Sequence, residues 1–236
     1  MARTVDPTVN AVRREAFVDA AQRLIQASGY EQMSIQDLLD ELDASRGAFY
    51  HYFDSKASLL DAVIARMVTD AMVAVEPIVE DPGLSATGKL VAMFSGIASW
   101  KVERMELLMA VLRVWLSDGN ALVRERFRRD VIETMTPVLT RIVRQGSRDG
   151  EFSVSDAEHV ARVLVSLLLG ANEHAGVLFT AHQAELVTLD EVEGALNAYP
   201  EAFERVLGAR RGSLRWFEPG DLRRWFDLAA IHPSTP

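Results

Sequence analysis

The residues best suited to binding chemistry lie in one short segment, Ser45-Arg46-Gly47-Ala48-Phe49-Tyr50-His51-Tyr52-Phe53-Asp54-Ser55-Lys56. Small, aromatic and basic side chains recur there at helical spacing, directly after a turn at Asp43-Ala44. A helix that enters a DNA groove needs small residues for close approach, polar tips for base edges and basic groups for phosphates. It also needs an apolar face that fixes it to a core.

A helical wheel separates the two sides of this segment, at about 100° per residue. Phe49 and Phe53 share one face, which can anchor the helix to its domain. The outer side carries Gly47, Ala48, Tyr50 and His51. The two small residues permit close approach to base edges, and the two rings carry polar tips that reach them.

Residues at helix starts supply candidate phosphate contacts. Arg46 can reach a guanine edge or a phosphate. Lys56, with the first amides of the helix that follows, forms an anion seat, and Ser34 is a further candidate. The wheel alone leaves a second interpretation open, in which the segment is only an amphipathic helix with an aromatic core.

The elements that must position these residues are all predicted to be helices, because apolar residues recur at three- and four-residue spacing. The first is expected at about 10–27, with Gly29 as its stop. Ser34-x-x-Asp37 resembles a capping box that opens the second, and Ser45 can cap the third. The second helix, its turn and the third helix would form a helix-turn-helix.

A long fourth helix is expected to begin after Asp54 or Ser55, and Pro77 should kink or end it. Further helices are expected at about 86–100, 104–117, 120–148, 155–182 and 188–209. The predicted fold class is all-α. It comprises an N-terminal three-helix helix-turn-helix head and a larger helical ligand-binding and dimerisation domain.

Composition limits the class of protein. The 236 residues are 49% hydrophobic and 25% charged and include no cysteine, which excludes disulfides and thiolate metal sites. The start of the chain lacks a signal-peptide pattern, and the longest apolar run, near 163–171, is too short for a membrane span. We therefore expect a cytoplasmic protein with no membrane partner.

The net charge of −9 argues against a nonspecific coat on nucleic acid. Even the first 56 residues hold six basic side chains against nine acidic ones. A site-specific DNA-binding protein remains possible if Asp37, Asp40 and Glu41 point away from DNA. Otherwise affinity would be low and would depend steeply on salt.

The stretch from Arg13 to about Arg66 resembles the DNA-binding head of the TetR family of bacterial transcriptional regulators. The matching residues are Ala20-Ala21, Leu24, Gly29-Tyr30, Ser34-Ile35-Gln36-Asp37-Leu38, Ser45 to Phe53, Ser55-Lys56 and Leu59-Leu60. Asp43 stands where the family usually has Gly, and Ala44 where a larger Val is common. Asp tolerates a left-handed backbone better than most residues, so the turn can persist.

The resemblance implies a homodimer that binds a palindromic double-stranded operator as a repressor and releases it on binding a small apolar or amphipathic effector. It implies no cofactor, and we expect no metal. By motif position, the base-reading residues are Gln36, Arg46, Gly47, Ala48, Tyr50 and His51. The phosphate-binding residues are Ser34, Tyr52 and Lys56. The sequence leaves open whether the protein represses or activates.

Three segments are expected: residues 1–56 for DNA binding, 57–212 for ligand binding and dimerisation, and a tail, 213–236, with a short aromatic helix. Adaptable methionines and aromatic rings across the middle helices suit an apolar pocket, although they could simply fill the core. The candidate pocket residues are Met67, Met93, Trp100, Met105, Met109, Trp115, Met135 and His174.

The helix after Asp156 is apolar nearly all round, so it must be buried on more than one side. A second subunit could cover the extra face, with the helix near 188–209 completing a four-helix bundle. The candidate interface residues are Val160, Leu164, Leu168 and Ala171. Ligand binding among the middle helices would move the fourth helix and change the spacing of the two recognition helices.

Two other classes of function were weighed. An enzyme is not expected, since the chain has no HExxH, no GxSxG, no phosphate-binding glycine loop and no cysteine. A helical interaction module would use the tail, where Leu222, Trp225 and Phe226 share one helical face. The alternative for the tail is packing against its own domain.

Overall fold

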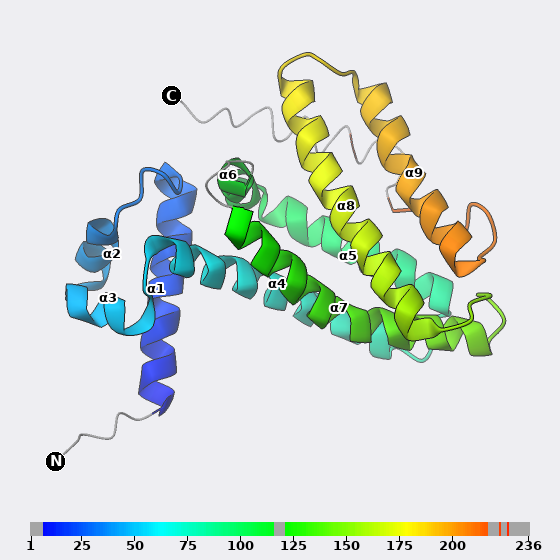
Figure 1. The fold of residues 1–236 in the computed structure, drawn as a ribbon, viewed down its shortest axis with the longest axis horizontal. Helices are drawn as coiled ribbons and strands as arrows, with labels where there is room; N and C mark the ends of the chain where they lie inside the picture. The colour runs from blue at the N-terminus through cyan, green and yellow to red at the C-terminus, as the bar shows by residue number, and fades with distance from the viewer. Residues whose placement is uncertain (1–6, 116–120, 217–221, 223–225, 227–236) are drawn as a thin grey trace. The chain divides into compact units, whose positions relative to one another are not determined.

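The computed structural model describes residues 7–115, 121–216, 222 and 226, and within these residues every regular element is an α-helix (Figure 1). The helices are α1 (Pro7–Ser28), α2 (Ile35–Leu42), α3 (Arg46–Tyr52), α4 (Lys56–Glu80), α5 (Ala86–Glu103), α6 (Met105–Trp115), α7 (Ala121–Arg148), α8 (Ala157–Gln183) and α9 (Leu189–Leu207). The expected all-α class is confirmed.

Local capping residues define the ends of the helix-turn-helix. Ser34 forms the predicted capping box with Asp37 at the start of α2, and the Ser45 hydroxyl accepts the Ala48 N–H at 3.2 Å at the start of α3. Between them, Asp43 adopts the left-handed conformation, with φ 46° and ψ 46°. The turn therefore survives without glycine because Asp is among the residues that tolerate this conformation.

The long helix α4 begins with a reciprocal pair of serines. The N–H of Ser58 donates to Oγ of Ser55, and the N–H of Ser55 donates to Oγ of Ser58, each at 3.1 Å. At its other end the helix continues past Pro77 and ends at Glu80. Pro77 therefore does not end the helix. The buried ammonium of Lys89 on α5 donates to the carbonyl of Val79 at 2.6 Å and satisfies one of the terminal acceptors.

The chain divides into two compact units: unit 1 comprises Met1–Thr69 and Glu106–Phe127, and unit 2 comprises Asp70–Met105 and Arg128–Pro236. The sequence placed a boundary at residue 56, whereas unit 1 continues through the first half of α4 and takes in most of α6. The core of the head combines α1 with α2, α3 and the start of α4. Its buried residues include Phe17, Ala20, Ala21, Ile25, Leu38, Phe49, Phe53, Leu59 and Leu60.

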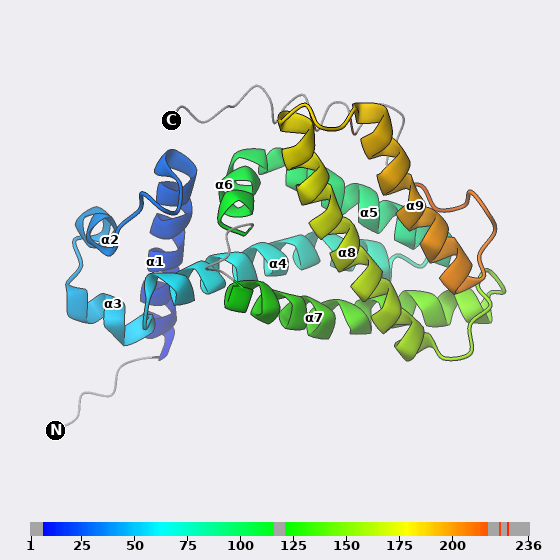
Figure 2. The same ribbon diagram turned by 45° about the horizontal axis from the view of Figure 1, so that its top comes forward.

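In unit 2, α8 and α9 form an antiparallel pair (Figures 1 and 2). The chain after α9 is anchored by Glu204, whose buried carboxylate accepts the N–H groups of Gly212 and Leu214 at 2.9 and 2.8 Å. The ring of Trp216 then packs against Phe94 and Phe203, with centroids 4.5 and 4.8 Å apart.

The aromatic end of the tail also packs on its own unit. Leu222 and Phe226 are buried in one cluster with Val192 and Leu196 of α9. This burial favours the packing interpretation of the tail over an exposed docking helix, because these two apolar side chains are already covered. Trp225, the third residue of the predicted docking face, lies outside the described residues.

Candidate DNA-binding face

Three phenylalanine rings hold α3 against the head. Phe49 is 0% and Phe53 3% exposed, and both rings lie near Phe17 of α1, with centroids 5.7 and 6.2 Å away. Both pairs have edge-to-face geometry, a preferred arrangement for aromatic side chains. The predicted anchoring face of α3 is therefore the buried one, and its orientation is fixed.

The opposite side of α3 is open to solvent. Arg46, Gly47, Tyr50 and His51 are exposed, whereas Ala48 and Tyr52 are partly buried. The His51 ring rests edge-on against Tyr52, at a centroid distance of 4.8 Å. Among the described residues, Arg46 has no hydrogen-bond or ion-pair partner. This face thus presents one free cation and two polar-tipped rings on a rigid helix.

Gly47 has no internal reason to be glycine. A Cβ built there would meet nothing closer than Oγ of Ser45 at 3.9 Å, and its φ is not left-handed. Glycine is less favourable than alanine inside a helix, by up to about 1 kcal/mol. A residue that weakens its helix without relieving any internal clash is consistent with close approach by something outside the protein.

The two candidates on α2 are already engaged with neighbouring carboxylates. Nε2 of Gln36 donates to Oδ1 of Asp40 at 2.8 Å. Both donors of Ser34, its N–H and its hydroxyl, bond to Oδ2 of Asp37 at 2.7 and 2.8 Å. The backbone hydrogen bond from Ser34 is the largest cause that lowers the pKa of Asp37. A phosphate at Ser34 would have to displace this carboxylate, because the predicted capping box already engages both donors.

Lys56 joins the first turn of α4 to the loop before α2. Its ammonium lies 4.2 Å from the centroid of the Tyr30 ring and donates to the carbonyl of Glu31 at 3.3 Å. Its charge also contributes to the lowered pKa of Asp37. An ammonium has three donors, so Lys56 keeps capacity for a phosphate beyond the Glu31 bond.

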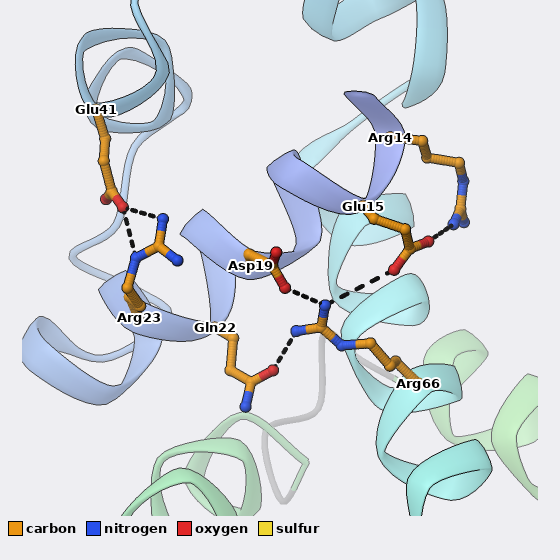
Figure 3. A network of polar contacts seen from close by, with 7 residues as sticks. All are labelled: Arg14, Glu15, Asp19, Gln22, Arg23, Glu41 and Arg66. Atoms are coloured by element: carbon orange, nitrogen blue, oxygen red, sulfur yellow. Dashed lines mark hydrogen bonds and ion pairs between the residues drawn. The ribbon is translucent and has the colours of Figure 1, made fainter. Parts of the chain in front are cut away.

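Many of the head's acids are turned toward its own arginines (Figure 3). Arg66 of α4 reaches Asp19 and Gln22 of α1, with Glu15 at 3.7 Å. Arg23 of α1 pairs with Glu41 of α2 at 2.6 Å. Glu15, Asp19 and Glu41 are therefore each matched by an arginine of the same unit. The excess of acids counted in the sequence therefore overstates the number of unmatched carboxylates in the head.

Comparison with known proteins agrees with this geometry. Residues 17–63 match the family model for bacterial regulatory proteins of the tetR family. An uncharacterized HTH-type transcriptional regulator from Lactococcus lactis is 45% identical over 51 residues, which span 22% of this chain and 26% of that protein. The HTH-type transcriptional repressor KstR2 of Rhodococcus jostii is 26% identical over 131 residues, 51% of this chain and 64% of that protein.

Residues 17–63 are therefore a TetR-family segment. This segment contains the helix-turn-helix described above, and the solved structure of RolR in complex with the ligand resorcinol shares the fold. That structure is 15% identical, covers 98% of this chain and 97% of its own, and has a TM-score of 0.60. The curated relatives are named as transcriptional regulators, in agreement with the expectation that the chain is not an enzyme. The alignments span less than two thirds of those relatives.

The candidate pocket residues divide between the two units. Met67 and Met109 belong to unit 1, and Met93, Trp100, Met105, Met135 and His174 to unit 2. Most of these side chains are buried, which is equally consistent with core packing. His174 is partly buried, and its Nδ1 lies 3.3 Å from the hydroxyl of Tyr199. The side chain of Trp115 lies outside the described residues.

The candidate interface residues on α8 need correction. Leu164 is 0% and Ala171 7% exposed within the single chain, so neither offers surface to a second copy. Val160 and Leu168 are partly buried. Because α8 is apolar nearly all round, the sequence could not show which side its own unit covers.

The exposed side of α8 lies next to the row that contains Leu164 and Ala171. It carries Val163, Ser166, Leu167, Gly170 and Val177, of which Val163 and Val177 are 49% and 56% exposed. On α9, exposed Gly194, Asn197 and Ala198 form a similar row. A Cβ at either glycine would meet nothing within 4 Å. We call these two rows the α8–α9 face.

By length and composition alone, α8 is also the single helix among the described residues that could cross a membrane. The earlier expectation considered only the run near 163–171, whereas the whole helix has 27 residues. Only 28% of its most apolar window is buried within the chain. An apolar surface of this kind needs a cover, and either a lipid or a second protein could supply it.

Proposed function

We propose that this protein is a transcriptional regulator that binds operator DNA through the exposed side of α3. The observation that carries the proposal is the two-sidedness of this helix: Phe49 and Phe53 are buried, while Arg46, Tyr50 and His51 face solvent. Such a helix can enter the major groove while its core face keeps it fixed. The name of its relative KstR2 favours repression over activation.

The DNA-binding form is a homodimer, with the α8–α9 face as its interface. Val163 and Val177 are exposed apolar side chains, and the open glycines of α8 and α9 allow another helix pair to approach closely. Two copies of an antiparallel pair, related by a two-fold axis, form a four-helix bundle. A two-fold dimer presents two copies of α3, which matches a palindromic operator. A second copy of the chain also covers α8 without a membrane, so the protein works in the cytoplasm.

Regulation comes from a small apolar or amphipathic effector that binds the helices of unit 2. RolR, which shares the fold, is described in complex with resorcinol. The helix α4 contains residues of both units, so it is the natural carrier of a signal from the effector to the head. An effector that prefers one arrangement of α4 would shift the population away from the DNA-binding form.

The test is binding of the purified protein to the DNA upstream of its own reading frame, followed by footprinting and by fluorescence anisotropy against random duplex. Lys56→Ala should weaken binding to all sequences, because Lys56 contacts phosphate. His51→Ala should weaken the operator more than random DNA, because His51 reads base edges. Arg148→Ala, an exposed residue at the end of α7, is the matched control and should change neither affinity.

Equal losses on operator and random DNA for both variants would contradict this assignment of roles. Absence of any protected site on the upstream fragment or elsewhere in the source genome would contradict the function itself.

A further inference from the structure

An unpaired cation lies within unit 2 where α5 meets α8. Lys101 stands in the last turn of α5 and is partly buried, and its ammonium donates a hydrogen bond to Oδ1 of Asn172 on α8. Among the described residues no carboxylate forms an ion pair with it. Asn172 is in turn held by its own helix, because its Nδ2 donates to the carbonyl of Leu168 at 2.9 Å.

The neighbouring acids on both helices are already committed to arginines. Glu173, next to Asn172, accepts from Arg128 at 2.9 Å. Glu103, two residues after Lys101, accepts from Arg104 at 3.0 Å. The positive charge of Lys101 is therefore held in place by an uncharged amide.

Removal of water from the Lys101 ammonium disfavours its charged form. Desolvation by burial lowers the pKa of Lys101 to about 8, and no neighbouring charge offsets it. Buried charges in proteins are normally paired, and an uncompensated one is a candidate for binding.

A buried donor without a partner comes from the neighbouring residue of α5. The indole Nε1 of Trp100 is buried and has no hydrogen-bond partner, and Trp100 is only 9% exposed. The guanidinium of Arg104 lies over this indole ring, 4.8 Å from its centroid, and adds to the positive field. Buried donors are satisfied in most native structures, so this indole N–H calls for an acceptor.

We propose that Trp100 and Lys101 bind the carboxylate of an acidic effector, with Asn172 positioning the ammonium. This inference rests on the proposed function, in which unit 2 takes a small effector. A carboxylate has two acceptor oxygens, and it can accept from both the ammonium and the indole N–H. A neutral phenol or alcohol would leave the ammonium without a counter-ion.

A purely structural role for Lys101 makes a different prediction. A lysine in the last turn of a helix interacts favourably with the helix dipole, and Lys101 could serve only there. In that case its removal would destabilise the free protein. If the ammonium instead awaits an anion, Lys101→Met should leave the melting temperature of the free protein unchanged or raise it.

The experiment uses the full-length protein and matched pairs of probes that differ in charge: benzoate and benzamide, salicylate and salicylamide, octanoate and octanamide. Calorimetry and thermal shift are measured for the wild type, Lys101→Met, Lys101→Arg and Arg129→Met, the last an exposed control on α7. We expect at least one carboxylate to bind the wild type about tenfold more tightly than its amide. That preference should vanish in Lys101→Met, persist in part in Lys101→Arg and be unchanged in Arg129→Met.

Equal binding of every acid and its amide overturns the proposal, as does a preference that survives in Lys101→Met or a lower melting temperature of that variant without ligand. DNA binding is measured separately, without probe, and should match the wild type in Lys101→Met. A protein that prefers carboxylates through Lys101 but binds no DNA would contradict the proposed function and leave the anion site supported.

Discussion

The helices α3 and α8 are both two-sided, but they expose opposite kinds of surface. The head helix buries aromatic rings and leaves Arg46 and His51 in water. The long helix of unit 2 buries Leu164 and leaves Val163 and Val177 in water. A polar face is stable in solvent and can gain or lose a partner reversibly, whereas an apolar face favours a permanent one. On our proposal, DNA is therefore the reversible partner and the second subunit the lasting one.

The same contrast holds for charges. In the head, Glu15, Asp19 and Glu41 are matched by arginines of the same unit. In unit 2, the one partner of the Lys101 ammonium among the described residues is the amide of Asn172. The head thus pairs these three carboxylates within its own unit, whereas a partly buried ammonium of unit 2 has no ion-pair partner among the described residues.

The largest effect should come from blocking the α8–α9 face. Gly170→Arg places a long cation where the single chain leaves open space, so each subunit should still fold while two copies are kept apart. We expect monomers by light scattering and a loss of operator affinity of about 100-fold or more, because two linked half-sites no longer bind together. Ser147→Arg, an exposed residue of α7, is the control. An unchanged Gly170→Arg dimer would show that α8 is covered in another way.

The next largest effect is expected from a change on the exposed polar face of α3. Arg46→Ala removes the free guanidinium of α3 and should reduce operator affinity by about 10- to 100-fold, while the melting temperature stays within a degree or two of the wild type. Anisotropy and calorimetry measure the two quantities. A large drop in melting temperature would mean that Arg46 serves the fold rather than DNA.

Gly47→Ala is predicted to have smaller effects, raising stability while weakening DNA binding. The new methyl group meets no clash, so the variant should gain about 0.5 kcal/mol of unfolding free energy from better helix propensity. If α3 approaches base edges at this residue, operator affinity should fall by about tenfold. Higher stability with undiminished DNA binding would contradict close approach at Gly47.

The smallest expected effect is a pH dependence of stability caused by Lys101 of unit 2, which the ion-paired acids of the head should not show. The pKa of Lys101 is lowered to about 8 in the folded state. Between about pH 8 and the ordinary lysine pKa, the unfolded chain therefore binds more protons than the folded chain does. Unfolding free energy should therefore rise with pH across this window. At pH 7 the unfolding free energy of the wild type should be about 1 kcal/mol lower than that of Lys101→Met. This difference, measured by urea titration, should shrink as the pH rises. A constant difference from pH 7 to pH 10 would contradict an unmet charge.

Short-range chemistry explains why so much of the head could be predicted. The capping box at Ser34, the left-handed Asp43 and the Ser45 cap each depend on residues within five positions. Phe49 and Phe53 follow a helical period that any helix there must obey. These constraints act before tertiary packing, so the sequence by itself determined the helix-turn-helix and the side of α3 that faces out.

Only the tertiary structure decided which groups from distant parts of the chain meet. Arg66 finds Asp19 across 47 residues and Lys101 finds Asn172 across 71, and no local period specifies either pair. On α8 the apolar residues surround the helix, so periodicity could not choose between Leu164 and Val163 as the buried one. That choice depends on which neighbouring helices pack against α8, and packing is a property of the whole fold rather than of any segment of its sequence.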